Sequence, residues 1–449
     1  MVTRNKKEPK KMLKRKIEQT LIEWKNTPNR SPLVIKGCRQ CGKTFSVRAF
    51  AKEHYKNEVY LNFFKNPDYI SIFEGSLEAD NLIILMSALL PEAVFEPGNT
   101  VIILDEIQDC PEARTALKFF KEDGRFDVIG TGSLLGVKGY GKQPKSIPVG
   151  SETLIEMYPL DFEEFLWANG ISEQIIDMLK ECLVDEKPVP KALHSRMQQL
   201  LLQYTVVGGM PAVVDTFVAT KQMNNVLALQ RDIVHSYEDD MVKYAEDTDK
   251  PLIKECFQSI PKQLSKENKK FQYSVVKKGG SASKFKGSLQ WIEDAGIISR
   301  CYNLEIPELP LDGNAIDDMF KVYMADTGLF VAMLEDGTQY DILQGNLYGY
   351  KGAIFENLMA DIFTKMGRKL YYYHKDSGLE VDFVTRYKGG ATLIEVKATT
   401  GNTKSTKTIL AHPEKYHVKG AIKLGEYNVG RTDKILTIPL YMGFLLTEY

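Results

Sequence analysis

The stretch that decides the fold is Leu33-Val-Ile-Lys-Gly-Cys-Arg-Gln-Cys-Gly-Lys-Thr44. Its first three residues form an apolar run that is typical of a buried strand. The residues after Thr44 have a helical pattern through Phe50 and Ala51. Between them lies G-x4-G-K-T, the Walker A phosphate loop, in the strand–loop–helix context that this motif requires. The sequence therefore predicts a P-loop that binds a nucleotide.

The loop is expected to hold phosphates through its backbone and one lysine. Glycines let successive N–H groups point at one spot, and the helix N-terminus adds a partial positive charge. Lys43 is predicted to reach the β- and γ-phosphates of ATP, and the Thr44 hydroxyl to ligate Mg²⁺. The residues predicted to bind the cofactor are Gly37, Arg39, Gln40, Cys41, Gly42, Lys43, Thr44 and Phe45.

A second motif, Val101-Ile-Ile-Leu-Asp105-Glu106, has four apolar residues followed by two carboxylates. Such a run is typical of a central parallel strand, and ligands bind beyond the carboxyl ends of these strands. We therefore expect Asp105 beside Thr44, where it would act on Mg²⁺ through water as the Walker B acid. Glu106 is predicted to be the base that orients the attacking water. The alternative is that Glu106 only caps the next element.

The rest of this domain also has an α/β pattern. Further strands are predicted at Val59–Phe63, Phe126–Gly130 and Glu152–Met157, with a helix from Glu112 to Lys121. One strand thus lies between the two motif strands along the chain, which predicts the P-loop class with an inserted strand. Thr131 and Ser133 end a strand beside Walker B, where a hydroxyl can contact the γ-phosphate or the attacking water. Alternatively, they only form the next turn. This is the sensor 1 position of AAA-type ATPases, which the domain resembles.

An absence of arginine bears on the oligomeric state. No arginine occurs between Arg125 and Arg196, the interval in which ring-forming AAA proteins usually carry their trans-acting arginine. Lysines are present there, but a lysine lacks the planar, bidentate fork of a guanidinium. We therefore expect a monomer or small oligomer rather than a hexameric ring. Arg231 is either a sensor 2 residue acting in cis or a member of a surface salt bridge.

Composition and charge exclude several other classes. The chain has 449 residues, 43% hydrophobic and 26% charged, with a formal net charge of -1. These values are typical of a soluble globular protein of two to four domains and exclude a uniformly cationic nucleic-acid binder. No apolar run of about 18 residues occurs, so no membrane span is expected. The basic residues of the segment 4–16 are interpreted as a solvated helix start or a phosphate contact, and not as an export signal.

The six cysteines are scattered without zinc-site spacing, which favours a reducing cytoplasm. Cys38 and Cys41 form a CxxC inside the phosphate loop. A helix N-terminus and Lys43 should lower a thiol pKa there. One hypothesis is that oxidation of this pair blocks nucleotide binding.

The middle of the chain is predicted to be helical from Tyr158 to about Tyr244, forming a lid beside the nucleotide. After it, three short helices and a strand pair resemble a winged helix-turn-helix, with Ser283–Glu293 in the recognition position. Its leading edge carries Lys277, Lys278, Lys284 and Lys286. This charge favours DNA as a partner. A structural or protein-binding winged helix is the alternative.

A second group of charged residues lies near the C-terminus. Two strands, Leu379–Val384 and Ala391–Ala398, are joined by a glycine turn that brings Asp382 opposite Glu395 and Lys397. Asp382, Glu395 and the preceding helix's Glu356 offer oxygen ligands to Mg²⁺. Lys397 can activate the attacking water in phosphodiester cleavage. The alternative is a solvated hairpin. The arrangement resembles the PD-(D/E)xK restriction-endonuclease-like fold.

Nearly the whole chain resembles a prokaryotic family of AAA-type ATPases with a restriction-endonuclease-like C-terminal domain of uncharacterised function. The motifs concerned are Gly37–Thr44, Asp105-Glu106, Thr131-Gly-Ser133, Tyr158-Pro-Leu160, Gly208-Gly-Met-Pro211, Tyr323–Leu329, Phe355-Glu-Asn357, Glu380-Val-Asp382-Phe383 and Glu395-Val-Lys397. The resemblance implies ATP binding. Cys38 and Cys41 depart from it, since apolar residues or proline are more usual in that loop.

These patterns predict an α/β protein of four domains. They are a P-loop core with a parallel sheet (1–160), a helical lid (161–248), a winged helix (249–306) and a restriction-endonuclease-like domain (307–449). The expected function is an ATP-hydrolysing switch that gates a nuclease-like domain acting on or near nucleic acid. The alternative is a regulatory ATP-binding protein whose inactive nuclease-like domain binds a protein partner.

Overall fold

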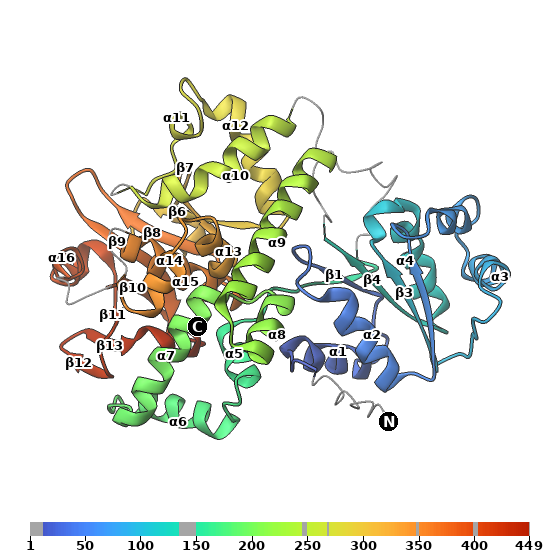
Figure 1. Ribbon diagram of the computed structural model, residues 1–449, viewed down its shortest axis with the longest axis horizontal. Helices are drawn as coiled ribbons and strands as arrows, with labels where there is room; N and C mark the ends of the chain where they lie inside the picture. Colours follow the sequence, from blue (N-terminus) through green and yellow to red (C-terminus); the bar gives the residue numbers. More distant parts are fainter. Residues whose placement is uncertain are drawn as a thin grey trace, which may run out of the picture.

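A computed structural model describes residues 12–133, 150–244, 249–266, 269–346, 350–397 and 403–448. The described chain contains a five-stranded sheet and an eight-stranded sheet. The two sheets lie at opposite sides of the molecule, and helix α9 (Met223–Tyr244) stands between them (Figure 1). Within the described ranges, no helix is both long enough and apolar enough to cross a bilayer.

The five-stranded sheet belongs to the N-terminal domain and is parallel throughout. Its strands are β1 (Leu33–Lys36), β2 (Asn57–Asn62), β3 (Thr100–Asp105), β4 (Asp127–Gly132) and β5 (Thr153–Glu156), in the order β2-β3-β4-β1-β5. Strand β4 is therefore inserted between the Walker A strand β1 and the Walker B strand β3. This arrangement confirms the predicted parallel sheet of a P-loop core.

Helices cover both faces of this sheet. They are α1 (Lys16–Asn26), α2 (Lys43–His54), α3 (Ala79–Leu89) and α4 (Pro111–Asp123). Alternate residues of β3 enter two separate cores: Val101 and Ile103 pack with α1 and α2, whereas Ile102 and Leu104 pack with α3 and α4. This alternation explains why the strand is apolar at every position.

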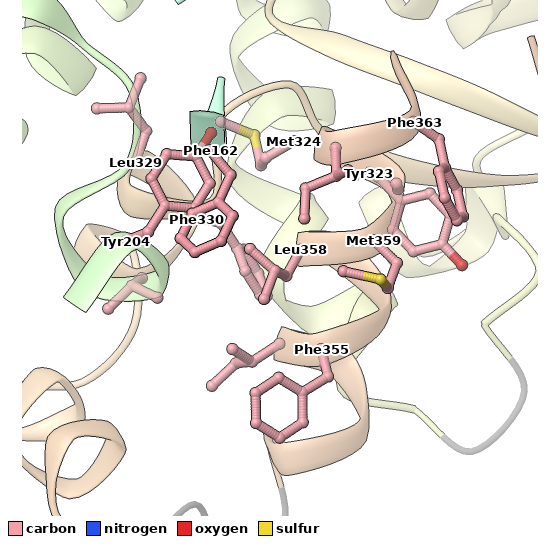
Figure 2. Close-up of a cluster of buried hydrophobic side chains, with 14 of the residues drawn as sticks. Phe162, Tyr204, Tyr323, Met324, Leu329, Phe330, Phe355, Leu358, Met359 and Phe363 are labelled. Carbon is pink, nitrogen blue, oxygen red and sulfur yellow. The ribbon is translucent and has the colours of Figure 1, made fainter. Parts of the chain in front are cut away.

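The helical region packs mainly against the C-terminal part of the chain. Its helices are α5 (Phe162–Ala168), α6 (Glu173–Val184), α7 (Lys191–Val207), α8 (Pro211–Thr220) and α9. Buried residues from Leu160 to Leu446 form one continuous hydrophobic cluster. Figure 2 shows part of it, where Phe162 and Tyr204 face apolar side chains of α15 (Lys351–Lys365).

The segment expected to form a winged helix contains three helices and one strand, and the antiparallel partner of that strand lies beyond the segment. They are α10 (Lys250–Leu264), α11 (Tyr273–Val276), α12 (Ala282–Asp294) and β6 (Ile298–Leu304). Strand β6 pairs antiparallel with β7 (Ala315–Met324) and parallel with β8 (Leu370–His374). The expected boundary at 306/307 thus falls between two paired strands, and the segments on either side of it share one sheet.

The C-terminal part completes the eight-stranded sheet, in the order β12-β13-β11-β10-β9-β8-β6-β7. Its further elements are α13 (Thr327–Ala332), α14 (Thr338–Leu343), β9 (Glu380–Tyr387), β10 (Gly390–Val396), α16 (Lys404–Leu410), α17 (Pro413–Tyr416), β11 (Gly420–Gly425), β12 (Gly430–Thr432) and β13 (Ile435–Pro439). Strands β8, β9 and β10 form an antiparallel meander, and β11 returns parallel to β10. Lys388 and Gly389, both at positive φ, make the two-residue turn between β9 and β10.

Candidate nucleotide site and C-terminal charged site

The phosphate loop joins β1 to α2, as its sequence predicted. A Cβ atom at Gly37 would lie 2.1 Å from the Met157 carbonyl oxygen, so this position requires glycine. Gly42 begins α2 in the left-handed conformation, with a φ of 99°. The Lys43 Nζ donates hydrogen bonds of 2.9 Å to the carbonyl oxygens of Gly37 and Cys38. The lysine therefore lies folded over its own loop.

Asp105 is the centre of a hydrogen-bond network at the end of β3. Its carboxylate accepts bonds from Thr44 Oγ1 at 2.9 Å, Tyr60 Oη at 2.6 Å and Asn62 Nδ2 at 2.7 Å. Burial and the bond to Asp105 raise the pKa of Tyr60 to about 12, so its hydroxyl stays a donor. The Asp105 carboxylate and the Thr44 hydroxyl are hard oxygen groups that fit Mg²⁺. Sequence reasoning missed Tyr60 and Asn62, although both alternate with apolar residues on β2.

Each of the two Walker B carboxylates meets a hydroxyl from the end of β4. Thr131 Oγ1 donates to Asp105, and Ser133 Oγ donates to Glu106 Oε2 at 3.4 Å. Gln108 Nε2 donates to the same Glu106 oxygen at 2.5 Å. Glu106 has a φ of 55°, a left-handed conformation that is uncommon for a residue other than glycine. Strained backbone of this kind is found at functional sites.

Arg15 binds the backbone of the phosphate loop, a role that the sequence did not reveal. Its guanidinium is buried and donates to the carbonyl oxygens of Cys41 at 3.1 Å and Tyr158 at 2.7 Å. It also pairs with the carboxylate of Glu164, at 3.1 Å. In the sequence, Arg15 is one of several basic residues in a row, and nothing local distinguishes it. The basic residues Arg4 to Lys11 lie outside the described residues.

Helix α9 also contacts the phosphate loop, through residues 39 and 40. Tyr237 Oη donates to the Arg39 carbonyl oxygen at 3.0 Å, and the Arg39 guanidinium forms an ion pair with Asp240. Gln40 Nε2 donates to Ser236 Oγ at 3.3 Å. Helix α9, in the region expected to form a lid, thus touches residues predicted to bind the nucleotide.

The other predicted residues of this site are placed as follows. Phe45 follows Thr44 on α2, and its side chain is 64% exposed. Arg231 lies in an exposed ion pair with Asp336, which is the surface salt bridge that the sequence offered as one alternative.

The C-terminal site brings together Asp382, Glu395 and Lys397, as the strand spacing predicted. Lys397 Nζ forms an ion pair with Glu395 and lies 4.0 Å from Asp382 Oδ2. Asp382 accepts a hydrogen bond from the Val396 backbone N–H at 2.8 Å. Glu395 accepts one from Thr406 Oγ1 at 2.5 Å. Burial, then Glu356, raises the pKa of Asp382 to about 7, although Lys397 opposes the shift.

Glu356 lies on α15 near this group, but its carboxylate is paired with two lysines. One carboxylate oxygen pairs with Lys269, and the other lies 3.7 Å from Lys321 Nζ and accepts a bond from Tyr323 Oη at 3.0 Å. Burial opposes ionisation of Glu356, but Lys321 and Lys269 hold its pKa below the ordinary value. Neither lysine was singled out from the sequence.

No group of three or more His, Cys, Asp and Glu side chains in the described ranges is arranged to hold a metal ion. In the C-terminal site, the carboxylates form ion pairs with lysines. The donor chemistry of Asp382 and Glu395 suits Mg²⁺, whereas the ion pairs of Glu356 compete with that use.

Comparison with known families divides the chain into three parts. Residues 29–166 match a family described as an AAA domain. Residues 198–340 and 351–442 each match a domain of unknown function, DUF8612 and DUF4143 respectively. The parallel sheet, the phosphate loop and this match together define the N-terminal part as an AAA-type P-loop ATPase domain.

Individual proteins give a second comparison. No curated protein matches the chain. Among solved structures, the Walker-type ATPase PABY2304 of Pyrococcus abyssi is 14% identical, with a TM-score of 0.42. The match covers 72% of this chain and 96% of that one.

Proposed function

We propose that the protein is a Mg²⁺-dependent ATPase switch that gates a C-terminal nuclease-like domain acting on or near nucleic acid. The observation that carries the ATPase part is the Asp105 network. It joins the phosphate loop through Thr44 to the sensor residue Thr131. A cation that binds the Asp105 carboxylate would therefore act on both Thr44 and Thr131.

In this proposal each residue of the nucleotide site has one role. Thr44 and Asp105 would hold Mg²⁺, which neutralises charge on the phosphates. Lys43 leaves the Gly37 and Cys38 carbonyls and turns to the β- and γ-phosphates. Glu106 accepts a proton from the attacking water while Ser133 holds its carboxylate.

Gating is supported by helix α15, which connects two charged groups. Glu356 lies in its first half, beside the C-terminal site. Lys365 at its end pairs with Asp361 at 2.7 Å and donates to the Leu160 carbonyl oxygen at 3.2 Å. Leu160 lies at the C-terminal end of the ATPase domain and also donates from its N–H to the Gly209 carbonyl oxygen at 2.7 Å. A shift of the segment around Leu160 would therefore act on α15.

A nuclease-like role is supported by topology and charge. The order α15-β8-β9-β10-α16-β11, with an antiparallel meander and a final parallel strand, is compatible with a restriction-endonuclease-like core. Exposed Lys277, Lys278, Lys284 and Lys286 on and before α12 suit a phosphate backbone, which favours DNA as the partner.

The alternative is a regulatory ATP-binding protein whose nuclease-like domain is inactive and binds a protein. The observation that favours it is the pairing of Glu356 with Lys269 and Lys321, because these cations take the place where a metal would approach.

Metal-dependent cleavage separates the two functions. Single-stranded DNA, double-stranded DNA and RNA are incubated with Mg²⁺ or Mn²⁺, with and without ATP, using the wild type and Lys397→Ala. The exposed Lys388→Ala, on the β9–β10 turn, is the matched control. Cleavage that Lys397→Ala abolishes and Lys388→Ala retains supports the gated nuclease. No cleavage of any substrate, with ATP hydrolysis intact, supports the regulatory alternative.

A further inference from the structure

The phosphate loop contains a pair of thiols, Cys38 and Cys41, at positions two and five of G-x4-G-K-T. Both are buried, with exposed fractions of 4% and 0%, and both belong to the same hydrophobic cluster beneath the loop. We propose that this pair is a site of reversible oxidation, at which a small hydroperoxide forms an intraloop disulfide that lowers the affinity for ATP. The affinity part of this inference rests on the ATP binding proposed above.

Two cations lie beside Cys41, whose Sγ also donates to the Met157 carbonyl oxygen at 3.4 Å. Its Sγ lies 3.9 Å from Lys43 Nζ, and its carbonyl oxygen accepts a bond from Arg15. The hydrogen bond from Cys38 lowers the pKa of Cys41 to about 6, against the effect of burial and with help from Lys43 and Arg15. A lowered pKa raises the share of thiolate, and the thiolate is the nucleophile in thiol oxidation.

The other four cysteines lack this environment. Burial raises the pKa of Cys110 and of Cys256 to about 12, and burial also raises the pKa of Cys301. Cys182, on α6, is the most accessible of the six, yet burial and Glu181 raise its pKa. Accessibility and reactivity therefore point to different cysteines, which makes the inference easy to test.

The chemistry balances with a hydroperoxide as the only co-reactant. The Cys41 thiolate attacks one peroxide oxygen, the O–O bond breaks, and the departing oxygen takes a proton to leave as water or alcohol. The sulfenic acid at Cys41 is then attacked by Cys38, which loses its proton, and the hydroxyl leaves as water. The two sulfur atoms give up two electrons to the peroxide. A small oxidant suits the site because both thiols are shielded from solvent.

Oxidation and ATP binding should oppose each other. Lys43 now bonds to the carbonyl oxygens of Gly37 and Cys38, so these peptides have to release it when the phosphates bind. A disulfide between residues 38 and 41 restrains the same peptides. Because linkage is reciprocal at equilibrium, bound ATP should favour the dithiol over the disulfide by the same factor by which the disulfide weakens ATP binding.

The test uses the full chain, treated with hydrogen peroxide and then with dithiothreitol. Peptide mass spectrometry maps the disulfide, and a fluorescent ATP analogue reports affinity. We expect a Cys38–Cys41 link, a fall in affinity of at least about tenfold, and recovery on reduction. Saturating ATP should slow formation of the link. The mapping does not require ATP binding, so failure of the disulfide and failure of nucleotide binding are distinguishable.

Variants complete the test. In Cys38→Ser, the ratio of affinities before and after peroxide should fall to about one, whereas Cys182→Ser should keep the wild-type ratio. Oxidation confined to Cys182, with the loop thiols free, would overturn the inference. So would a loop disulfide that leaves the affinity for ATP unchanged.

Discussion

The two carboxylate sites of this chain are built from similar residues but neutralised differently. At the nucleotide site, Asp105 is surrounded by neutral donors: two threonine hydroxyls, a tyrosine and an amide. At the C-terminal site, Glu356 and Glu395 are each paired with lysine. The first arrangement keeps a negative charge available for a cation, whereas the second supplies its own cations.

The difference shows that carboxylates in similar sequence patterns can have neutral partners in one site and cationic partners in another. In both sites a carboxylate lies at or beside the end of a buried strand. At the C-terminal site, however, Lys269 and Lys321 come from outside the strands that carry the motif. Five experiments test how the charged groups of the chain are used.

Replacing the loop lysine should have the largest effect. Lys43→Ala removes the cation closest to the phosphates and should lower kcat/KM for ATP by about 10²–10³-fold, or roughly 3–4 kcal/mol of transition-state stabilisation. Steady-state ATPase assays measure this. Lys52→Ala, exposed on the same helix, should have wild-type activity. An equal loss in both variants would mean that the phosphates do not bind at this loop.

Glu106→Gln should come next. The amide cannot take a proton from water, so turnover should fall by about 10²-fold while ATP remains bound. Single-turnover hydrolysis and equilibrium ATP binding are compared, with exposed Glu122→Gln as the control. Unchanged turnover would assign Glu106 to capping the next element.

Asp382 should make stability depend on pH. Its pKa of about 7 in the folded chain lies above the ordinary value of 3.8. Between these values the folded chain holds a proton that the unfolded chain has lost, so the free energy of unfolding falls as pH rises. From about pH 5 to pH 8, the Tm of Asp382→Asn should therefore fall less than that of the wild type, by a few °C. Exposed Asp318→Asn should follow the wild type; parallel curves for all three would exclude a raised pKa at Asp382.

Lys269→Ala tests whether this lysine competes with a metal at Glu356. Loss of the ion pair should raise the affinity of the C-terminal site for Mn²⁺ by about tenfold, or roughly 1.4 kcal/mol. Calorimetry with Mn²⁺ measures this, and exposed Lys262→Ala on α10 is the control. An unchanged or weaker affinity would make the pair a purely structural contact.

Arg231→Ala should have the smallest effect. Its partner Asp336 is 84% exposed, so the pair should contribute less than about 1 kcal/mol to stability. ATPase activity should stay at the wild-type value. A large fall in activity at unchanged Tm would instead restore a sensor 2 role.

Much of the nucleotide domain follows from local sequence. The P-loop, the Walker B strand and the hydroxyls of Thr131 and Ser133 were predicted because each depends on one short segment and its strand. The extent of the shared sheet was not predictable. Strand β6 carries no sign that it pairs with both β7 and β8, and its pairing with β8 joins residues 69 positions apart.

Local sequence is enough to predict the phosphate loop, its carboxylates and the order of Asp382, Glu395 and Lys397. These features arise from backbone geometry and from the two-residue period of a strand. Long-range folding, in contrast, places Arg15 and α9 against the loop, and Lys269 and Lys321 beside Glu356. These contacts join residues between 26 and 201 positions apart, or 35 and 87 in the second site. A charged residue in a helix or loop gives no local sign of the partner that folding brings to it.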